Sequence, residues 1–356
     1  MTTMMEEILQ QPGALTDLRK YYESPGAIPH KTLHSLVSHW PPVVIFTGMG
    51  ASLFAAYPAQ AYLTSHGIRA LVWETAELLH HHLPMLRRDT LIVAISQSGE
   101  TIEITRLLQR LPKDVGVVAA VNVERSTLAR RCDLLLPMMA GRQTTVSTKT
   151  YMCSVAVLMY LAFSIAGEPH RHLTQVLLQA IRAQERILDQ REMIIQPTVE
   201  FFDHPPYVAL MSRGPDLASA MQSALTLKET VRLAAEPISA GQFRHGPIEI
   251  VNPTHRYVIF ARQAQPGLRA AKTDTGKLML GLANDIQSHG GRVLLFTDLP
   301  FTEIPNVRVV PVEPVRLGLG TLVDTLYMQL LAHELAVRAG LEPGKFWIAQ
   351  GVTREE

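Results

Sequence analysis

Cysteine and aromatic residues are scarce in this sequence, and its charges nearly cancel. The chain has two cysteines, Cys132 and Cys153, in 356 residues and no CxxC pair, which excludes a disulfide framework and a zinc site built on cysteine pairs. Aromatic residues make up 6%, and 33 basic residues face 32 acidic ones, so the chain lacks the stacking platforms and the positive charge of a nucleic-acid binder. We therefore expect a reducing compartment and no nucleic-acid partner.

Targeting signals and long apolar runs are also missing. The N-terminal segment carries Glu6 and Glu7 where a secretory signal would have basic residues, and no apolar segment follows them. No run reaches the roughly 18 apolar residues of a membrane span, and the longest candidate, Val155–Ala166, is interpreted as a buried helix. The expected location is cytoplasmic, without a membrane partner.

Short apolar, β-branched runs recur along the chain, and several end in Gly, Ser or Asp. Runs of this kind without polar alternation are typical of strands that are buried on both faces of a parallel sheet. They are residues 43–48, 91–96, 115–122, 207–212, 257–261, 293–298 and 307–312. Helices are predicted over 51–66, 100–111, 151–166, 217–235, 278–289 and 317–339. This alternation predicts an α/β fold with parallel, flavodoxin-like sheets flanked by helices.

The two halves of the sequence repeat one order of elements. In each half a strand with a Gly-containing turn is followed by a second strand, a helix, a third strand and an edge-like strand near a proline. Two tandem copies of one open α/β unit fit the length better than a single sheet. We predict a helical segment over 1–40, a first domain over 41–199, a second domain over 200–340 and a tail over 341–356.

The loop Ser96-Gln-Ser-Gly-Glu-Thr101 follows a predicted strand and directly precedes a predicted helix. In open parallel sheets, ligands bind beyond the carboxyl ends of the strands. The hydroxyl groups of this loop can donate hydrogen bonds, Gly99 lets the backbone approach a ligand, and the free amides of the helix favour an anion. The pattern predicts a neutral phosphate cradle, with helix capping by Ser98, Glu100 and Thr101 as the open alternative.

Two further loops carry glycine or hydroxyl groups before a predicted helix. Thr47-Gly-Met-Gly-Ala-Ser52 contains a GxG pair but lacks the third glycine of a dinucleotide fingerprint. The segment Thr144–Lys149 adds three threonines and one serine. Three such loops in one half of the chain favour a phosphate ligand. The consecutive histidines His80–His82 cannot all face one ion, so no metal and no cofactor are expected.

The second half supplies two candidate titratable groups. Glu229 lies on a predicted helix and is a candidate general base, with a solvent-exposed carboxylate beside Lys228 and Arg232 as the alternative. His245 lies in a segment punctuated by Gly and Pro, and is either a catalytic histidine or an ordinary surface residue.

The motifs together resemble those of the double sugar isomerase (SIS) domain family. This family includes the isomerase half of glucosamine-6-phosphate synthase, glucosamine-6-phosphate deaminases and fructosamine-6-phosphate deglycases. The resemblance covers the chain from about residue 40 to its end. The matching motifs are Gly50-Ala-Ser52, Ser96–Thr101, Val146-Ser-Thr-Lys149, Ser212-Arg-Gly214, Leu227-Lys-Glu229, Gly241-Gln-Phe-Arg-His-Gly-Pro247 and Ala349-Gln-Gly-Val-Thr353.

The resemblance implies a role for each matching residue. Glu229 would move a proton between C1 and C2 of a phosphosugar through an enol, and His245 would assist ring opening or protonate a leaving amine. In the family this histidine often comes from a neighbouring subunit, so a homodimer is expected. The residues implied to hold the sugar phosphate are Ser52, Ser96, Gln97, Ser98, Thr101 and Ser147, and Gly50 and Gln350 are candidate substrate contacts.

The departures from the family pattern narrow the expected reaction. The synthase uses a tail lysine to form a Schiff base, but Gln350 stands at the matching position and cannot form an imine. Gln222 and Thr226 stand where the synthase helix has two charged residues, and the synthase's glutaminase domain has no counterpart in this sequence, so glutamine is not the expected nitrogen source. We therefore expect a substrate that already carries nitrogen, either an amino-sugar phosphate undergoing deamination or a fructosamine phosphate undergoing deglycation.

Two other functions remain open from the sequence. One is a sugar-phosphate sensor without catalysis, which would not need both Glu229 and His245. The other is a plain aldose–ketose isomerase, which would use the same residues but release no amine. The enzyme with C–N cleavage is the favoured hypothesis.

Overall fold

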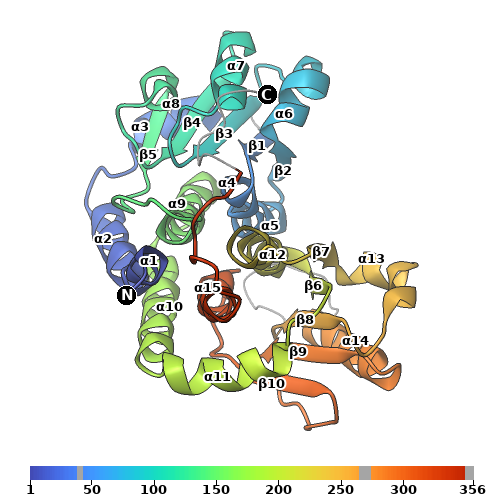
Figure 1. Cartoon of the computed structure of the whole chain (residues 1–356). Helices are drawn as coiled ribbons and strands as arrows, with labels where there is room; N and C mark the ends of the chain where they lie inside the picture. Colours follow the sequence, from blue (N-terminus) through green and yellow to red (C-terminus); the bar gives the residue numbers. More distant parts are fainter. Residues whose placement is uncertain (38–42, 264–273, 349–356) are drawn as a thin grey trace. The chain divides into compact units, whose positions relative to one another are not determined.

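Contacts along the chain divide it into two units, each built on one sheet. A computed structural model describes residues 1–37, 43–263 and 274–348 (Figure 1). One unit comprises residues 10–178 and 346–356 and is called the β1–β5 unit; the other comprises residues 1–9 and 179–345 and is called the β6–β10 unit. The division predicted from the sequence, with its boundary near residue 200, stays a prediction.

The β1–β5 unit contains a parallel five-stranded sheet in the order β2-β1-β3-β4-β5. Helices α7 and α8 cover one face of this sheet, and α5 and α9 cover the other. Its elements are α2 (Gln11–Glu23), α3 (His30–Val37), β1 (Val43–Gly48), α4 (Ala51–Phe54), α5 (Tyr57–Ser65), β2 (Arg69–Glu74), α6 (Thr75–Glu77), η1 (Leu78–His82), η2 (Leu83–Met85), β3 (Thr90–Ser96), α7 (Ile102–Arg110), β4 (Gly116–Val121), α8 (Thr127–Arg131), β5 (Leu134–Pro137) and α9 (Lys149–Ala166). Helix α10 (Arg171–Asp189) contains the boundary between the units.

The β6–β10 unit repeats this architecture with the order β7-β6-β8-β9-β10. Helices α13 and α14 cover one face of the sheet, and α12 and α15 cover the other. Its elements are α1 (Thr3–Leu9), α11 (Arg191–Phe202), β6 (Val208–Ser212), η3 (Gly214–Asp216), α12 (Leu217–Val231), β7 (Ala235–Ser239), α13 (Ala240–Arg244), η4 (Pro247–Ile250), β8 (Arg256–Ala261), α14 (Thr275–Ser288), β9 (Arg292–Thr297), β10 (Val307–Pro311) and α15 (Thr321–Arg338).

The two sheets share one topology, which confirms the predicted pair of α/β units. Counted within each unit, the strand order is 2-1-3-4-5, the order of flavodoxin-like folds. The order reverses direction between the first and third strands, and ligands of such folds bind beyond the carboxyl ends of these two strands. In the β1–β5 unit these are β1 and β3.

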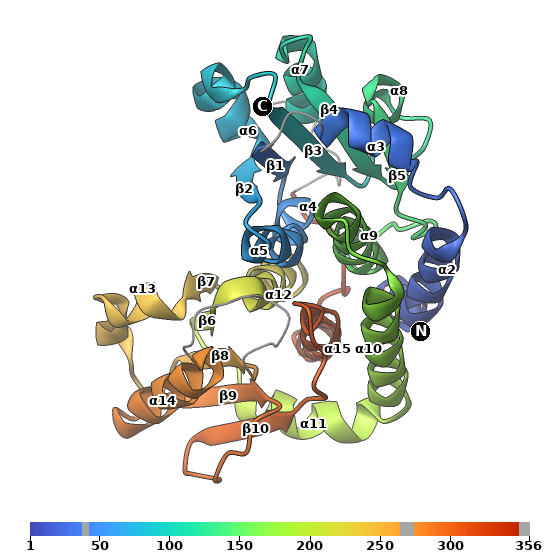
Figure 2. The same cartoon turned by 180° about the vertical axis from the view of Figure 1, so that it is seen from behind.

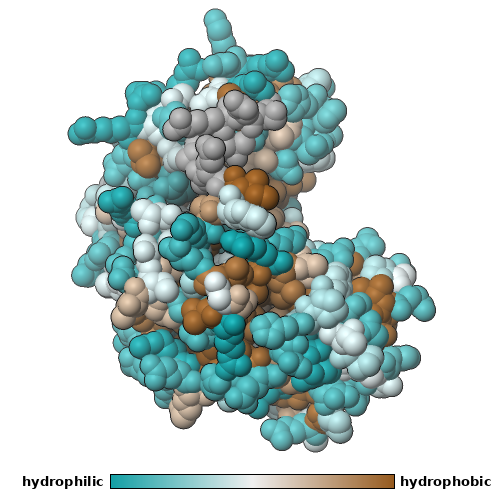
Figure 3. Space-filling model, viewed as in Figure 1, coloured by the Kyte–Doolittle hydropathy of each residue, from teal (hydrophilic) through white to brown (hydrophobic). Residues whose placement is uncertain are grey.

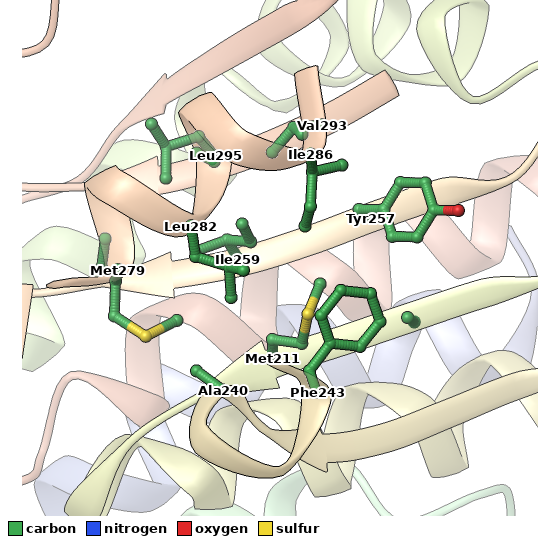
Figure 4. Close-up of a cluster of buried hydrophobic side chains, with 13 residues drawn as sticks. Met211, Ala240, Phe243, Tyr257, Ile259, Met279, Leu282, Ile286, Val293 and Leu295 are labelled. Atoms are coloured by element: carbon green, nitrogen blue, oxygen red, sulfur yellow. The ribbon is translucent and has the colours of Figure 1, made fainter. Parts of the chain in front are cut away.

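Both units bury continuous apolar layers. In the β6–β10 unit, side chains of α14 such as Leu282 and Ile286 pack on Ile259 of β8 and on Val293 and Leu295 of β9 (Figure 4). Hydrophilic residues predominate on the face drawn in Figure 3, as expected when the apolar residues are used in such cores.

Helix α9 is the most apolar helix of the β1–β5 unit. Among the described residues it is the one helix whose length and composition would allow it to cross a membrane, but 83% of it is buried in the protein. It packs against α2 and α5. The interpretation of Val155–Ala166 as a buried helix is therefore confirmed.

Some of the predicted elements were wrong in detail. The predicted helix over 51–66 is two helices, α4 and α5. The helix predicted over 217–235 ends at Val231, because Arg232 adopts a left-handed conformation with φ of 60° and Ala235 begins β7. Strands β2 and β7 were not predicted. Both are edge strands with partly exposed side chains, and β7 contains Pro237, so neither shows the continuous apolar run of a central strand.

Candidate active site

The loops that follow β1 and β3 meet at one edge of their sheet. The strands are hydrogen-bonded neighbours, with Thr47 opposite Ala94. Gly48 allows the loops to approach, because a Cβ at this position would lie 2.9 Å from the Ile95 carbonyl oxygen and 3.1 Å from Cβ of Ser52. The structure therefore places Ser52 beside the end of β3, where the second predicted phosphate loop begins.

The Ser96–Thr101 loop is held by its own side chains. Ser96 Oγ accepts a hydrogen bond from Gly99 N at 2.9 Å, and Ser98 Oγ accepts one from Glu100 N at 3.2 Å. Gly99 has φ of +67°, and a Cβ on it would lie 2.6 Å from Cβ of Ser126. Glycine is therefore required both by the backbone conformation and by the close approach of Ser126.

The start of α7 offers unoccupied hydrogen-bond donors. Thr101 is the N-cap residue, and neither it nor Ser98 caps the helix with its side chain, so the capping alternative does not hold for these residues. Thr101 Oγ1 is buried and has no hydrogen-bond partner among the described residues. A buried hydroxyl beside the free amides of a first helical turn suits an anionic oxygen, because each unmet donor is costly without a ligand.

Gln143 organises the third loop, and the sequence interpretation did not recognise it. Its Oε1 accepts hydrogen bonds from the backbone N–H groups of Thr148 at 3.1 Å and Thr150 at 3.0 Å. Ser147 Oγ hydrogen-bonds to Thr150 Oγ1 at 3.0 Å. A side-chain amide six positions before the start of α9, in a loop rich in hydroxyl groups, is the signal that could have identified Gln143.

Glu229 is half-buried on α12 of the β6–β10 unit. Gln222 and Thr226 share its face of the helix and are buried, with Thr226 Oγ1 donating to the Gln222 carbonyl oxygen at 2.9 Å. Glu229 Oε2 is buried without a hydrogen-bond partner among the described residues, and loss of hydration raises the pKa of this carboxyl group to about 7. The alternative of a fully solvated Glu229 is therefore wrong, although Lys228 beside it is exposed.

His245 and Gly50 lie at the ends of short helices. His245 directly follows α13 and is exposed to solvent. The segment predicted as a loop is thus partly helical, since Ser239 Oγ accepts from Gln242 N and caps α13. Gly50 is the N-cap residue of α4 and has φ of 50°. The predicted contact Gln350 lies outside the described residues.

The carboxyl edge of the second sheet contains an ion pair instead of a hydroxyl-rich loop. Arg262, which follows β8, pairs with Asp324 of α15, and both side chains are almost fully buried. Asp324 Oδ2 also accepts from Arg262 Nε at 3.2 Å and from Ser219 Oγ of α12 at 2.8 Å. Burial raises the pKa of the nearby Asp216 to about 7, although Arg262 opposes this shift. The equivalent position of the second unit is thus filled by protein side chains.

Among residues 1–37, 43–263 and 274–348, no group of three or more His, Cys, Asp and Glu side chains is placed to hold a metal ion. The polar groups gathered at β1, β3 and α7 are hydroxyls, amides and backbone N–H groups, which bind anions.

The family model of the SIS domain matches residues 40–164, the region that holds β1 to β5 and most of α9. The chain contains a SIS domain. The predicted family resemblance is therefore confirmed, and the second sheet repeats the topology of the matched region.

The chain is also similar over nearly its whole length to a longer protein. It is 26% identical over 358 residues to a glutamine–fructose-6-phosphate aminotransferase (isomerizing) of Bartonella quintana, covering 95% of this chain and 56% of that protein. The chain thus spans little more than half the length of this relative.

Solved structures of the family share the complete fold. The C-terminal domain of glucosamine-fructose-6-phosphate aminotransferase from Francisella tularensis has a TM-score of 0.85 at 21% identity, with 97% of this chain and 98% of that chain covered. Glucosamine-6-phosphate deaminase from Thermotoga maritima has a TM-score of 0.73 at 20% identity, with 99% of each chain covered. At these identities the likeness establishes the architecture of two tandem SIS-type domains.

Proposed function

We propose that this SIS protein is a phosphosugar isomerase-type enzyme that cleaves a C–N bond in a phosphorylated amino sugar or fructosamine. The observation that carries the proposal is Glu229, a half-buried carboxyl group whose Oε2 has no partner among the described residues. With its pKa raised to about 7, such a group can both accept and return a proton near neutral pH. Moving a proton between adjacent carbons requires one group that removes the proton from the first carbon and delivers it to the second.

The substrate phosphate is assigned to the loops at the carboxyl ends of β1 and β3. Hydroxyl and backbone N–H donors there can bind phosphate oxygens without a metal ion. The buried hydroxyl of Thr101 supports this assignment, because a phosphate oxygen would satisfy it. The residues proposed to bind the phosphate are Ser52, Ser96, Gln97, Ser98 and Thr101, with Ser147 contributing from the loop before α9.

The reaction needs no oxidant or reductant. For a fructosamine phosphate, Glu229 removes a proton from C1, and the C–H electrons form the C1–C2 double bond of an enaminol. The same carboxyl group returns the proton to C2, which leaves an imine at C1, and water then releases the amine and an aldose phosphate. For an amino-sugar phosphate the proton moves from C2 to C1, and ammonia leaves from C2. We assign ring opening and protonation of the leaving nitrogen to His245.

The names of the relatives support a hexose phosphate with nitrogen as the substrate class. One relative is named for amination of fructose-6-phosphate and one structural neighbour for deamination of glucosamine-6-phosphate. Gln350 cannot form an imine with a ketose, so the substrate's own nitrogen is proposed to do so. The proposal includes a cytoplasmic homodimer, because the family resemblance implies that the histidine comes from a neighbouring subunit.

Product analysis with purified protein tests this function. The panel contains glucosamine-6-phosphate, galactosamine-6-phosphate, several fructosamine-6-phosphates, and fructose-6-phosphate with ammonia, and mass spectrometry measures the sugar phosphate and the released amine. We expect amine release that Glu229→Gln abolishes and Glu185→Gln preserves, since Glu185 is an exposed residue of α10. Amine release that survives intact in Glu229→Gln would contradict the assignment of the base.

The two alternative functions give different results in the same experiment. Saturable binding of a sugar phosphate without turnover would support a sensor. Aldose–ketose conversion without release of amine or ammonia would support a plain isomerase.

A further inference from the structure

A cavity lies within the β6–β10 unit, among residues that the proposed reaction does not use. It has a volume of about 390 Å³, within the usual range of small-molecule sites. Figure 2 shows α11 running alongside β10, and the cavity is bounded by these two elements, the end of α10 and α15. Its apolar lining consists of Ala183, Ile187, Met193, Ile194, Val309, Val310, Pro311, Val312, Val323 and Tyr327.

The inner wall of the cavity is apolar and fixed in position. Tyr327 is 4% exposed, and its hydroxyl donates to the Ile194 carbonyl oxygen at 2.9 Å and hydrogen-bonds to Thr198 Oγ1 at 2.6 Å. Its ring packs edge-on against Phe296 at 5.1 Å. Because the hydroxyl is already paired, Tyr327 offers a ligand its apolar ring. At the cavity's edge, Met193 is 69% exposed, so a ligand that removes its apolar side chain from water would be bound more favourably.

The charged residues of the lining leave one cation without a counter-charge. Arg186 and Glu313 form a two-point ion pair, with Arg186 Nε 2.6 Å from Glu313 Oε1, and thus neutralise each other. Arg308 on β10 is exposed and forms no ion pair or hydrogen bond with any residue of the described chain. The cavity therefore favours a ligand with a single negative charge.

The geometry of β10 places this cation and a backbone donor together. Val307 and Val309 pack toward the α14 side of the sheet, so Arg308 and Val310 point to the opposite side, where the cavity lies. The Asn306 carbonyl oxygen accepts from Val293 N, and Val312 N donates to the Thr297 carbonyl oxygen. The even-numbered residues of this strand therefore direct their backbone N–H and C=O groups toward β9. The N–H of Val309 therefore faces the free edge of the strand.

We propose that this cavity binds a small carboxylate with an apolar, ring-sized body. The carboxylate would pair with the Arg308 guanidinium and the Val309 N–H, and the apolar part would lie against Tyr327 and Val323. A carboxylate fits better than a sugar phosphate, because the lining offers one free cation and few polar groups beside it. This ligand class differs from the substrate of the proposed reaction.

The site can influence α12 through α15. Val323 and Tyr327 flank Asp324, which accepts a hydrogen bond from Ser219 of α12, and α12 packs along α15. A ligand that shifts Val323 would therefore act on the helix that carries Glu229. Binding at the cavity does not depend on whether Glu229 is catalytic.

Calorimetric titration of the full chain with 3-phenylpropionate tests the proposal, with 3-phenylpropanamide as the neutral analogue. We expect saturable binding of the acid, at least about tenfold weaker binding of the amide, and a similar loss in Arg308→Gln. Arg182→Gln, which changes an exposed arginine of α10 outside the cavity, should bind like the unchanged protein.

The proposal is overturned if the acid does not bind, or if it binds equally well to Arg308→Gln. Displacement of the acid by glucosamine-6-phosphate would also overturn it, because the acid would then occupy the sugar-phosphate site. Since these readouts are independent of turnover, failure of the proposed enzyme activity leaves this test intact.

Discussion

Glu229 shows how burial alone can prepare a carboxyl group for proton transfer. Its two neighbours on the same helix face, Gln222 and Thr226, are neutral, and the shift of its pKa to about 7 comes from lost hydration. A carboxyl group stabilised by a nearby cation would instead stay ionised and bind protons weakly. The neutral face of α12 thus favours reversible proton transfer.

The pH dependence of the reaction should report this group. Glu229 must be deprotonated to remove a proton, so we expect kcat/KM to rise with pH and to level off above about 7. The measurement is a pH–rate profile on the substrate that the panel identifies. An acid limb near the ordinary carboxyl value would contradict the role of Glu229 as the base.

The substrate phosphate also titrates, near pH 6, and would change the same pH–rate profile. The protonation of Glu229 should therefore also be measured directly. Carbon-13 NMR of glutamate carboxyl groups should show one signal with a midpoint near 7 that is absent in Glu229→Gln. In Glu185→Gln this signal should remain.

Gly99 is a second residue whose replacement has a measurable consequence. An alanine there would have to adopt φ of +67° and would press on Ser126. We expect Gly99→Ala to raise KM for the sugar phosphate about tenfold or more and to cost roughly 1–3 kcal/mol of stability. Steady-state kinetics and thermal unfolding measure the two effects.

Gly141→Ala is the matched control for this change. Gly141 has the same φ of +67°, but a Cβ on it would meet no atom within 4 Å. The control should therefore show the cost of the backbone conformation without the loss of phosphate affinity. An equal rise in KM in both variants would show that the contact with Ser126 does not shape the loop.

At the scale of helices and strands, we predict the effect of breaking the buried ion pair between Arg262, which follows β8, and Asp324 of α15. Asp324→Asn leaves Arg262 buried without its counter-charge, so we expect a loss of about 3–5 kcal/mol in the free energy of unfolding. Glu313→Gln makes the same chemical change in the exposed pair with Arg186 and should cost less than about 1 kcal/mol. Urea unfolding of both variants measures the difference, and equal losses would contradict the argument.

The central strands were predictable from the sequence, as was the edge strand β10, but the edge strands β2 and β7 were not. Central strands such as β3 are buried on both faces, so their side chains are apolar at successive positions. Strand β2 has one buried residue, Ala70, among six, and β7 has Glu236 and Pro237 within five residues. Edge strands pair on one side only, so they tolerate such residues and lose the signal.

The part of the candidate site that is built from glycines and hydroxyl-bearing residues was predictable from the sequence. The turn at Gly99 and the meeting of the β1 and β3 loops follow from residue type and the parallel-sheet rule. The sequence could not decide whether Glu229 is solvated, because burial depends on packing from distant segments. Gln143 was missed because its three acceptor contacts appear only in the folded loop.

For the chain as a whole, two neighbouring helices belong to different units. Ile8 of α1 and Leu15 of α2 are both fully buried, but α1 packs against α15 and α2 packs against α9. We expect Ile8→Ala and Leu15→Ala each to cost about 2–5 kcal/mol, in different parts of the protein. Hydrogen exchange should rise in α12 and α15 for Ile8→Ala and in α5 and α9 for Leu15→Ala.

These variants are controls for each other, because they remove the same kind of side chain only seven positions apart. If both changed exchange in the same helices, the assignment of α1 and α2 to separate units would be contradicted.

The contact between α1 and α15 also has a consequence for synthesis. Thr2 Oγ1 and His333 Nε2, 2.7 Å apart in the folded chain, are separated by 331 positions in the sequence. At about 5–20 residues per second, a ribosome needs roughly 20 to 70 s to travel from one to the other. For most of that interval α15, the helix against which α1 packs, has not yet been synthesised, although Met4 and Ile8 are fully buried in the folded chain. The apolar side chains of α1 therefore wait for their packing partner until translation is nearly finished.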